Sequence, residues 1–495
     1  MNLIGKEVTR IDGDQKVTGK AIYGNDIKLN DMLYAACKYT DIVTGKIISI
    51  DTSAAEKIPG VKTIALYKDI PGAQKVGPIR QDYLPIVNDE VFFTGDVIAV
   101  VAAESREAAF KAADAIKVEY EPYKPLTDPR KAVSPKARLI HPEYKSNIVN
   151  HYPLRKGNIK IGFQVADAIL TRTYTTGFQE HAYIEPETVT VEPDHSTGGF
   201  NIYGSIQNPY TTRKVAAMYM NLPLNRINVI PSVLGGSFGG KDDIINNMVC
   251  RAALLCQMTG EPVQMTNSRE NSLRESYKRH PYIMNYKVGF TREGRIIAMK
   301  IDILADSGAY SSQTFFVTWR SVVQATGPYE IPHVETDIRS VYTNNCYTAA
   351  FRGFGSPQII FAQESLMDEI AVHCELTPLE VRLINGFKQD SITASGQMLS
   401  EHKVSLRQVL NTAVEKADFV NKWQANREFI KLPPRYRKGI GLACSYRGCS
   451  LGAEGTDVSS AIVSIQADGS LIVITAVSEN GQGLQTTMCQ IACEY

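Results

Sequence analysis

Hydrophobic residues along the first 130 positions alternate between strand-like runs and helical spacing, which predicts a compact mixed α/β unit. Residues 92–103 read FFTGDVIAVVAA, and their length and β-branched content predict a buried strand. Ser105 is the expected N-cap of a following helix, with Glu107 favourable in its first turn. A further strand is expected at 118–120. The packing side of the helix carries Ala108, Ala109, Ala112, Ala113 and Ile116.

From residue 151 the pattern changes to short strands interleaved with longer helices. The residues between 307 and 355 show no regular period and predict a long irregular stretch. Strands are expected around 169–176, 187–194, 200–206 and 227–233, a strand pair at 282–306, and helices at about 210–221 and 243–259.

The last part of the chain predicts three helices and a hairpin. Residues 356–375 are expected to be helical, with packing positions at Phe361, Met367, Ile370 and Cys374. Thr377-Pro378 predicts a helix start, because an N-cap residue precedes a proline in the first turn. Ser405 is expected to cap another helix, and residues 459–478 predict a β-hairpin that turns at 467–469. The apolar residues of that last helix are Leu406, Val409, Leu410 and Ala413.

These elements predict an α+β chain of three domains. Their expected bounds are 1–128, a linker at 129–150 that is rich in Pro, Lys and His, then 151–400 and 401–495. The chain stops at Tyr495, a dozen residues after a Gly-Gln-Gly turn. A domain that has just begun its sheet does not normally end there, so we expect the last domain to be incomplete.

Composition narrows the class of protein. Of the 495 residues, 44% are hydrophobic and 21% are charged, which is typical of a globular protein. The 53 basic and 52 acidic residues leave a formal net charge of +1, which gives no reason to expect a nucleic-acid or membrane partner. The first ten residues, MNLIGKEVTR, contain no apolar signal region, and no run is long enough to span a bilayer. We therefore expect a cytoplasmic protein.

The nine cysteines do not form a recognisable cluster. No pair has Cys-x-x-Cys spacing, and neither common ferredoxin spacing is present. We expect reduced, mostly buried thiols. If the protein carries out redox chemistry, its electron carriers are therefore non-cysteine groups or lie on a partner.

The densest glycine cluster, GGSFGGKD at 235–242, lies between a predicted strand and a predicted helix. Its spacing fits the start of a Walker A loop, but Asp242 replaces the hydroxyl residue that would bind Mg²⁺. Two interpretations remain open. The cluster is either a tight turn or a loop whose bare backbone amides approach a polar ligand.

Two further loops combine glycine with residues suited to ligand binding. Residues 350–358, AFRGFGSPQ, interleave two aromatics and an arginine with glycines before a helix. This pattern indicates either a loop packed on the core or a loop that stacks on a flat ligand. Residues 481–483, GQG, with Thr486 nearby, resemble another amide-rich turn.

Together these loops resemble the molybdenum-binding subunit of the xanthine dehydrogenase, or molybdenum hydroxylase, family. Matching segments follow in family order along essentially the whole chain: TGKA at 18–21, TGD at 94–96, QEH at 179–181, IQN at 206–208, GGSFGGKDD, AFRGFGSPQ and NGQGLQTT. The resemblance implies a hammerhead-like first domain and molybdopterin-binding domains at 151–400 and 401–495.

The family's chemistry implies a molybdopterin cofactor, in bacteria often as its cytosine dinucleotide. Its dithiolene holds the metal, so no protein ligands to the metal are expected. The implied reaction hydroxylates purine-like or other N-heteroaromatic substrates with oxygen from water, and 2Fe-2S and FAD groups on partner subunits would take the electrons. An aldehyde oxidoreductase or a non-catalytic cofactor-holding half subunit remains the alternative.

Individual roles are implied only where this sequence matches the family motifs. Gln207, Phe238 and Gly239 match residues at the metal's oxo ligand, and Arg352 falls in the loop beside its hydroxyl ligand. Gly481, Gln482, Gly483 and Thr486 match a cofactor-contacting turn. Phe354 matches an aromatic that stacks on substrate, Asp242 a substrate-orienting carboxylate, and Arg320 a catalytic arginine that stabilises negative charge.

Two departures from the family pattern bear on activity. Leu451 stands roughly where purine oxidisers carry a second stacking phenylalanine. The catalytic base is expected in a Gly-Glu-Pro motif, but Glu261 in such a tripeptide is predicted to lie in a helix-to-strand turn. We therefore expect the base to lie outside this chain, either on a second molybdenum-subunit fragment or in the missing part of a truncated chain.

Overall fold

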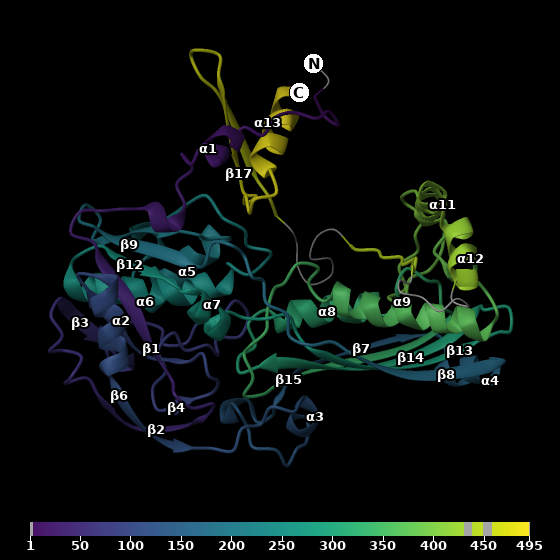
Figure 1. Cartoon of the computed structure of the whole chain (residues 1–495), viewed down its shortest axis with the longest axis horizontal. Coiled ribbons are helices and arrows are strands. Elements are labelled where there is room, and N and C mark those ends of the chain that lie inside the picture. Colours follow the sequence, from purple (N-terminus) through teal and green to yellow (C-terminus); the bar gives the residue numbers. More distant parts are fainter. Residues whose placement is uncertain (1–2, 430–437, 449–457, 495) are drawn as a thin grey trace.

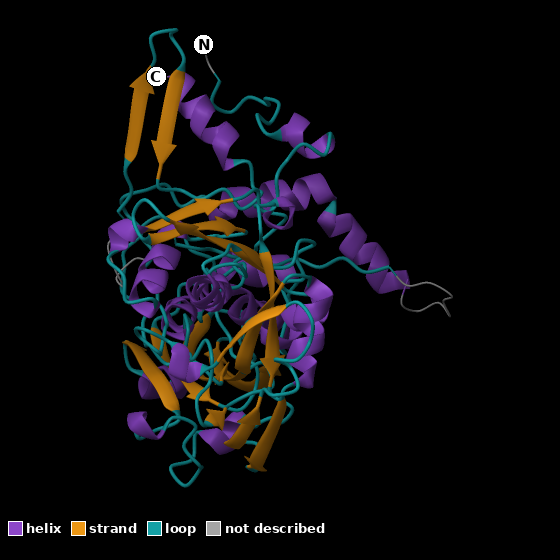
Figure 2. Cartoon of the chain, turned by 90° about the vertical axis from the view of Figure 1, so that its left-hand side faces the viewer, coloured by secondary structure: helices purple, strands orange, loops and turns teal. Residues whose placement is uncertain are grey.

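The computed structural model describes residues 3–429, 438–448 and 458–494. It is an α+β structure, as the sequence predicts, with two large sheets side by side and an upper layer that contains both ends of the chain (Figure 1). Figure 2 shows the same molecule turned by 90°, with the hairpin projecting from one end.

The larger sheet has seven strands, and it joins segments far apart in the sequence. The pairing of β1(Leu33–Tyr39) with β12(Val263–Thr266) connects the first 128 residues to the segment after residue 151, so the sheet crosses the predicted boundary. The strand order is β11(Ile227–Pro231), β10(Gly199–Gly204), β9(Thr188–Asp194), β12(Val263–Thr266), β1(Leu33–Tyr39), β5(Val97–Ala103) and β3(Val61–Ala65).

Helices pack on this sheet as their small and apolar residues predict. α2(Arg106–Ala115) begins at Ser105, whose hydroxyl accepts a hydrogen bond from the Ala108 amide at 3.1 Å. α6(Asp243–Thr259) is buried over most of its length and forms the core together with α5(Pro209–Tyr219). A small sheet of β2(Gly45–Asp51), β4(Glu90–Val91) and β6(Lys117–Pro122) lies beside them, and α7(Arg269–Glu275) follows β12.

The second sheet has five strands, with two long helices along one face (Figure 1). Its core contains the buried residues of α9(Ser356–His373) together with the inward side chains of the strands. The strand order is β7(Ile148–Lys156), β15(His333–Tyr342), β14(Ile296–Gly308), β13(Tyr282–Phe290) and β8(Ala168–Thr175), and the helices are α8(Thr314–Gln324) and α9(Ser356–His373), with the short α3(Pro129–Ala132) and α4(Ile159–Gln164) nearby.

The prediction of an irregular stretch between 307 and 355 is wrong, because this segment contains α8 and β15. Charged residues at 335, 337 and 339 obscure the strand, although its alternate residues are buried. β15 pairs in parallel with β14 and antiparallel with β7. These partners stabilise a strand whose own sequence is weakly apolar.

Three packing expectations need correction. Two expected packing residues are largely exposed. Phe361 is 51% exposed and makes an edge-to-face contact with Tyr174, and Val409 is 60% exposed. Ser405 occupies the N-cap position of α11(Leu406–Ala417) without a side-chain cap, so the predicted helix start is confirmed but its stabilisation by the serine hydroxyl is not. By contrast, Thr377 caps α10(Pro378–Asn385) as expected.

The ends of the described chain meet in the upper layer (Figure 1). The Ile11 amide donates to Thr486 at 3.1 Å, and the Gln490 side chain donates to the Leu3 carbonyl at 2.9 Å. The predicted hairpin is present as β16(Ala461–Ile465) and β17(Leu471–Thr475), and most of its apolar residues are exposed. The remaining helices are α1(Gly13–Val17), α12(Phe419–Phe429) and α13(Leu484–Glu494).

Within the described part of the chain, the cysteines are free thiols. None of the helices described there combines the length and apolar character needed to cross a bilayer.

Candidate functional site

A cavity of about 930 Å³ opens where the glycine-containing loops around residues 239, 353 and 481 meet. Its lining includes eight of the residues that the family motifs indicate: Gln207, Phe238, Gly239, Asp242, Arg352, Phe354, Gly481 and Gln482. They come from segments far apart in the chain. The fold therefore gathers most of the predicted cofactor and substrate residues at one place.

Two of these loops are joined by their backbones. The Arg352 amide donates to the Phe238 carbonyl at 2.9 Å. Gly239 has φ +94°, and a Cβ there would lie 3.1 Å from the Ala350 carbonyl oxygen. Glycine is thus required both by the backbone conformation and by the close approach of the second loop. This arrangement leaves bare peptide groups at the cavity wall.

Gln207 lies at the base of the glycine loop. Its backbone amide donates to the Lys241 carbonyl at 3.0 Å, and its side-chain oxygen accepts a hydrogen bond from Ser237. Because the oxygen already has a partner and Gln207 lines the cavity, its side-chain amide nitrogen is available as a donor there. A hydrogen bond to an electronegative ligand atom fits this geometry.

Asp242 is the carboxylate of the cavity, immediately before α6. Gln313 donates to its Oδ2 at 2.7 Å, and burial raises the pKa of Asp242. The hydrogen bond from Gln313 opposes that shift by favouring the charged form. No sequence signal indicated Gln313, because it lies in the segment predicted to be irregular.

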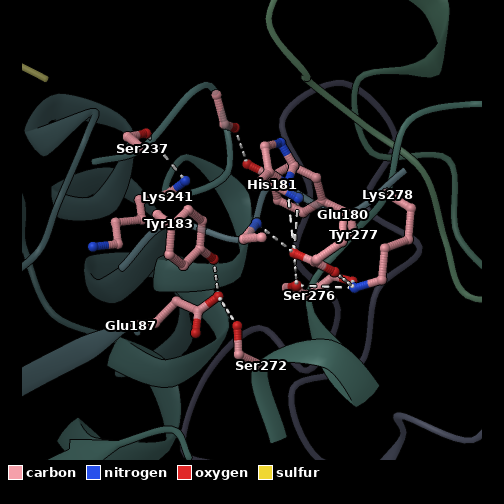
Figure 3. A network of polar contacts seen from close by, with 12 residues as sticks. Glu180, His181, Tyr183, Glu187, Ser237, Lys241, Ser272, Ser276, Tyr277 and Lys278 are labelled. Carbon is pink, nitrogen blue, oxygen red and sulfur yellow. Dashed lines mark hydrogen bonds and ion pairs between the residues drawn. The ribbon is translucent and has the colours of Figure 1, made fainter. Parts of the chain in front are cut away.

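A buried polar network supports the two loops from behind (Figure 3). His181 Nε2 contacts the Ala350 carbonyl at 2.9 Å, and burial lowers the pKa of His181 to about 4, so the ring is neutral and donates. A Cβ on Gly240 would lie 2.7 Å from the His181 ring, which therefore packs directly under the glycine loop. Glu180 is paired with Lys278, while Lys241 is paired with Glu185 at 2.7 Å.

Arg279 supports the second loop from another side. Its guanidinium lies 3.9 Å from the centre of the Phe351 ring and donates to the Arg352 carbonyl at 3.0 Å. Burial lowers the pKa of Arg279 to about 10. The motif QEH at 179–181 stands out in the sequence. Lys278 and Arg279, which contact it in the fold, do not, because nothing in the sequence around them indicates that they support the loop.

Three of the predicted residues are not among those that line the cavity. Arg320 lies on α8, 8% exposed, with Nη1 donating to the Gly448 carbonyl at 3.1 Å. Thr486 accepts the Ile11 amide, and Gly483 packs near Arg10. Leu451 lies outside the described residues, whereas Glu261 is exposed between α6 and β12, as the sequence predicts.

The donor set of the cavity suits a cofactor that brings its own metal ligands. Among the residues that the structure describes, no group of three or more His, Cys, Asp or Glu could hold a metal ion. The lining instead offers glycine backbone, the Gln207 side chain and Asn480, whose buried Oδ1 has no hydrogen-bond partner. These groups fit the polar edge of a pterin and its phosphate.

Comparison with known families assigns all three parts of the chain. Residues 18–124 match the a/b hammerhead domain of aldehyde oxidase and xanthine dehydrogenase. Residues 140–386 and 412–495 match two models of a molybdopterin cofactor-binding domain. These matches confirm the fold that the resemblance implied.

Two curated relatives cover most of the chain. The nicotinate dehydrogenase large molybdopterin subunit of Eubacterium barkeri is 36% identical over 425 residues, which are 86% of this chain and 99% of that subunit. A probable xanthine dehydrogenase subunit of Bacillus subtilis (strain 168) is 34% identical over 489 residues, which are 98% of this chain and 63% of that protein.

Among solved structures, the aldehyde oxidoreductase of Desulfovibrio gigas superposes with a TM-score of 0.84 at 26% identity. The match covers 97% of this chain and 53% of that protein. The chain therefore spans about half to two thirds of the length of these two longer relatives, the Bacillus and Desulfovibrio proteins.

Proposed function

Because this chain belongs to the aldehyde oxidase and xanthine dehydrogenase family, as a molybdopterin-binding subunit, we propose that it is the catalytic polypeptide of a molybdenum hydroxylase. The observation that carries the proposal is the cavity in which Gln207, Gly239, Asp242 and Phe354 meet. When bound, the molybdenum cofactor supplies a two-electron oxidation with oxygen derived from water.

The chain's own residues divide between cofactor and substrate. Gln207 would donate from its side-chain amide to the cofactor's oxygen, and the backbone at Phe238 and Gly239 would approach the same oxygen, since no side chain at Gly239 stands in the way. Arg352, Gly481 and Gln482 line the cavity, where Arg352 would lie beside the metal and the other two would contact the pterin. Gly483 and Thr486 hold that turn through the N-terminal segment, since Thr486 bonds Ile11.

The cofactor is proposed to be the cytosine dinucleotide form. A neighbouring cavity of about 880 Å³ lies between β11 and β17, and Gly481 lines both cavities. An elongated pterin nucleotide therefore has room to extend from one cavity into the other. Arg213 lines the second cavity and would face the phosphates, and Lys16, which is ion-paired with Asp12, lines it as well.

The substrate is proposed to be a purine-like or other N-heteroaromatic compound. Asp242, held by Gln313, can orient ring N–H groups, and Phe354 can stack on a flat ring. Arg320 does not line the cavity, but it bonds Gly448, which follows the lining residue Arg447, and from there it would stabilise the negative charge that develops as oxygen attacks the ring. Relatives named for xanthine and nicotinate support a heteroaromatic substrate, while the Desulfovibrio aldehyde oxidoreductase keeps an aldehyde as the alternative.

Partner chains are proposed to complete the enzyme. The catalytic base would come from a second molybdenum-subunit fragment, and electrons would pass to an Fe–S subunit and an FAD subunit. The Eubacterium and Bacillus relatives are each named as one subunit of a dehydrogenase, which supports a multi-subunit assembly. The exposed apolar faces of β16 and β17, which include Ile462 at 61% and Ile474 at 57% exposure, are where the second fragment would pack. We propose a cytoplasmic location and purine catabolism as its setting.

Metal analysis and a substrate screen on the natively purified complex test this function. We expect molybdenum, a pterin nucleotide and turnover of at least one N-heteroaromatic compound. Molybdenum without turnover of any heteroaromatic or aldehyde would favour a non-catalytic half subunit. Absence of molybdenum from the native complex would refute the proposal.

A further inference from the structure

A second and much smaller cavity lies beside the start of α6, near the proposed active site. Its volume is about 20 Å³, which is room for a single water-sized species. Asp82, from the first 128 residues, and Asp243, the first residue of α6, both line it. The cavity thus lies between the hammerhead part of the chain and the glycine loop of the site.

In each of these two carboxylates, one oxygen accepts hydrogen bonds and the second oxygen has no hydrogen-bond partner. Asp82 Oδ2 accepts the Ser311 amide at 2.9 Å and the Tyr342 hydroxyl at 2.6 Å, and Asp243 Oδ2 accepts the Ser312 hydroxyl. Oδ1 of Asp82 and Oδ1 of Asp243 are buried and have no hydrogen-bond partner. The two residues are only 1% and 7% exposed.

The cavity wall also contains an uncharged polar group that is buried without a hydrogen-bond partner. The hydroxyl of Tyr347, a residue 1% exposed, is also buried without a hydrogen-bond partner. Its ring is fixed by aromatic neighbours, among them Tyr83 at 5.2 Å between ring centres. Unpaired buried polar atoms are costly, so three of them around one cavity indicate a ligand between them.

Burial and the neighbouring charge of Asp242 raise the pKa of Asp243, and the part of the chain that the structure describes supplies no cation that balances the two carboxylates of the cavity. No basic side chain in the described chain lies within ion-pair distance of Asp82 or Asp243. Arg80 reaches Asp82 only through the Tyr342 hydroxyl, to which it donates at 3.0 Å. Two buried carboxylates that share a small space repel one another unless a cation or a proton lies between them.

We propose that this cavity is a structural calcium site, with Asp82 and Asp243 as its charged ligands. All the unpaired atoms are oxygens, which hard cations prefer, and two carboxylates balance a charge of +2. The space leaves no room for the several waters that Mg²⁺ usually retains. Ser312, Tyr347, Asn246 and Asn247 also line the cavity, and their side-chain oxygens would supply the further ligands.

The site would connect the fold to the proposed active site. Asp243 directly follows Asp242, so a cation that holds Asp243 against Asp82 also fixes the start of α6 and the end of the glycine loop. Ser312 and Gln313, which bond Asp243 and Asp242 respectively, are adjacent on the loop before α8. Three segments of the chain would therefore be locked together by one ion.

Calcium analysis of the natively purified complex, in parallel with melting curves, tests this proposal. We expect about one calcium per chain, a fall of several degrees in Tm with EGTA, and recovery with excess Ca²⁺. D82N and D243N keep the side-chain volume and remove one charge each, so both should lower bound calcium at least ~10-fold and abolish the response to EGTA. D96N is the matched control, because Asp96 is 1% exposed and its oxygens are bonded by Phe92 and Tyr310.

The control should lower Tm while calcium content and EGTA sensitivity stay as in the wild type. A wild-type complex without stoichiometric calcium and without a Ca²⁺-dependent Tm would overturn the site and leave a proton or a water between the carboxylates. Full calcium occupancy in both D82N and D243N would overturn it as well. Molybdenum measured in the same samples separates this outcome from failure of the proposed function.

Discussion

The imidazole of His181 stacks on the ring of Phe351, with ring centres 4.2 Å apart and planes 24° apart. The guanidinium of Arg279 lies 3.9 Å from the centre of the same aromatic ring. Phe351 thus contacts both a neutral ring and a cation, while His181 also bonds the Ala350 carbonyl. These contacts fix the backbone that precedes Arg352 and Phe354 at the cavity.

Replacing His181 should change how stability depends on pH. Burial lowers the pKa of His181 to about 4, whereas an unfolded histidine has a pKa of about 6.5. Between these values the unfolded chain binds a proton that the folded chain excludes, so the wild type loses stability as pH falls, by up to about 3 kcal/mol. His181→Gln can still donate to Ala350 but does not titrate.

The Tm of the wild type minus the Tm of His181→Gln should therefore decrease as the pH falls from neutral toward the folded-state pKa of His181. Burial also lowers the pKa of His280, to about 3, but this group is present in both proteins and its effect cancels. Melting curves over that pH range check the expectation. A Tm difference independent of pH would mean that His181 is not held neutral by the fold.

A side chain at Gly239 should lower molybdenum content. Gly239→Ala introduces a Cβ 3.1 Å from the Ala350 carbonyl, in a backbone conformation that L-residues rarely adopt. The loop must then move away from its partner, and the cofactor amides move with it. Gly260→Ala is the control, because Gly260 also has positive φ but no atom within 4 Å of its Cβ position. Metal analysis should find a several-fold loss of molybdenum only in the first variant; equal content in both would place the cofactor elsewhere.

Asp242 should act mainly on substrate binding. Asp242→Asn keeps an oxygen that can accept the Gln313 hydrogen bond and removes the charge. Loss of a charge-assisted hydrogen bond to substrate costs about 1.5–3 kcal/mol, so KM should rise by roughly 10- to 100-fold with a smaller change in kcat. Steady-state kinetics on several heteroaromatic compounds check this, and an unchanged KM for all of them would remove Asp242 from the substrate site.

Much of this architecture follows from local sequence. The helix after Ser105, the capped helix at Thr377 and the exposed hairpin all have strong local signals, and the structure contains each of them. The strand predicted at 92–103 is present only over 97–103. The glycine loops are identifiable because glycine at close backbone approaches leaves a clear pattern. Gly239 is the best case, since both its φ and its neighbour Ala350 demand it.

What could not be predicted depends on contacts between distant segments. β15 is stabilised by β14 and β7 rather than by its own apolar content. The pairing of β1 with β12 joins residues 33–35 to 263–265, and no local pattern encodes it. Gln313 and Arg279 likewise acquire their roles only when the fold brings them to Asp242 and Phe351.

The arginine of α8 tests the proposed substrate class. Arg320 is 8% exposed, and its Nη1 donates to the Gly448 carbonyl at 3.1 Å, so the guanidinium is held in place before any substrate arrives. If the substrate is an electron-poor heterocycle, negative charge develops on its ring as oxygen attacks. A positioned cation stabilises that charge more than it stabilises the neutral substrate, and it therefore acts on turnover.

Arg320→Met in the assembled complex should lower kcat by about 10²–10³ and leave the molybdenum content intact. Arg320→Lys retains the charge but not the fixed guanidinium geometry, so it should recover part of the rate. In the alternative, Arg320 only anchors the segment at Gly448. Loss of that anchor would lower the Tm of both variants relative to the wild type, while turnover per molybdenum would stay at the wild-type value. A wild-type rate for Arg320→Met on the best heteroaromatic substrate would argue against a heterocycle and favour an aldehyde, whose attack builds no charge on a ring.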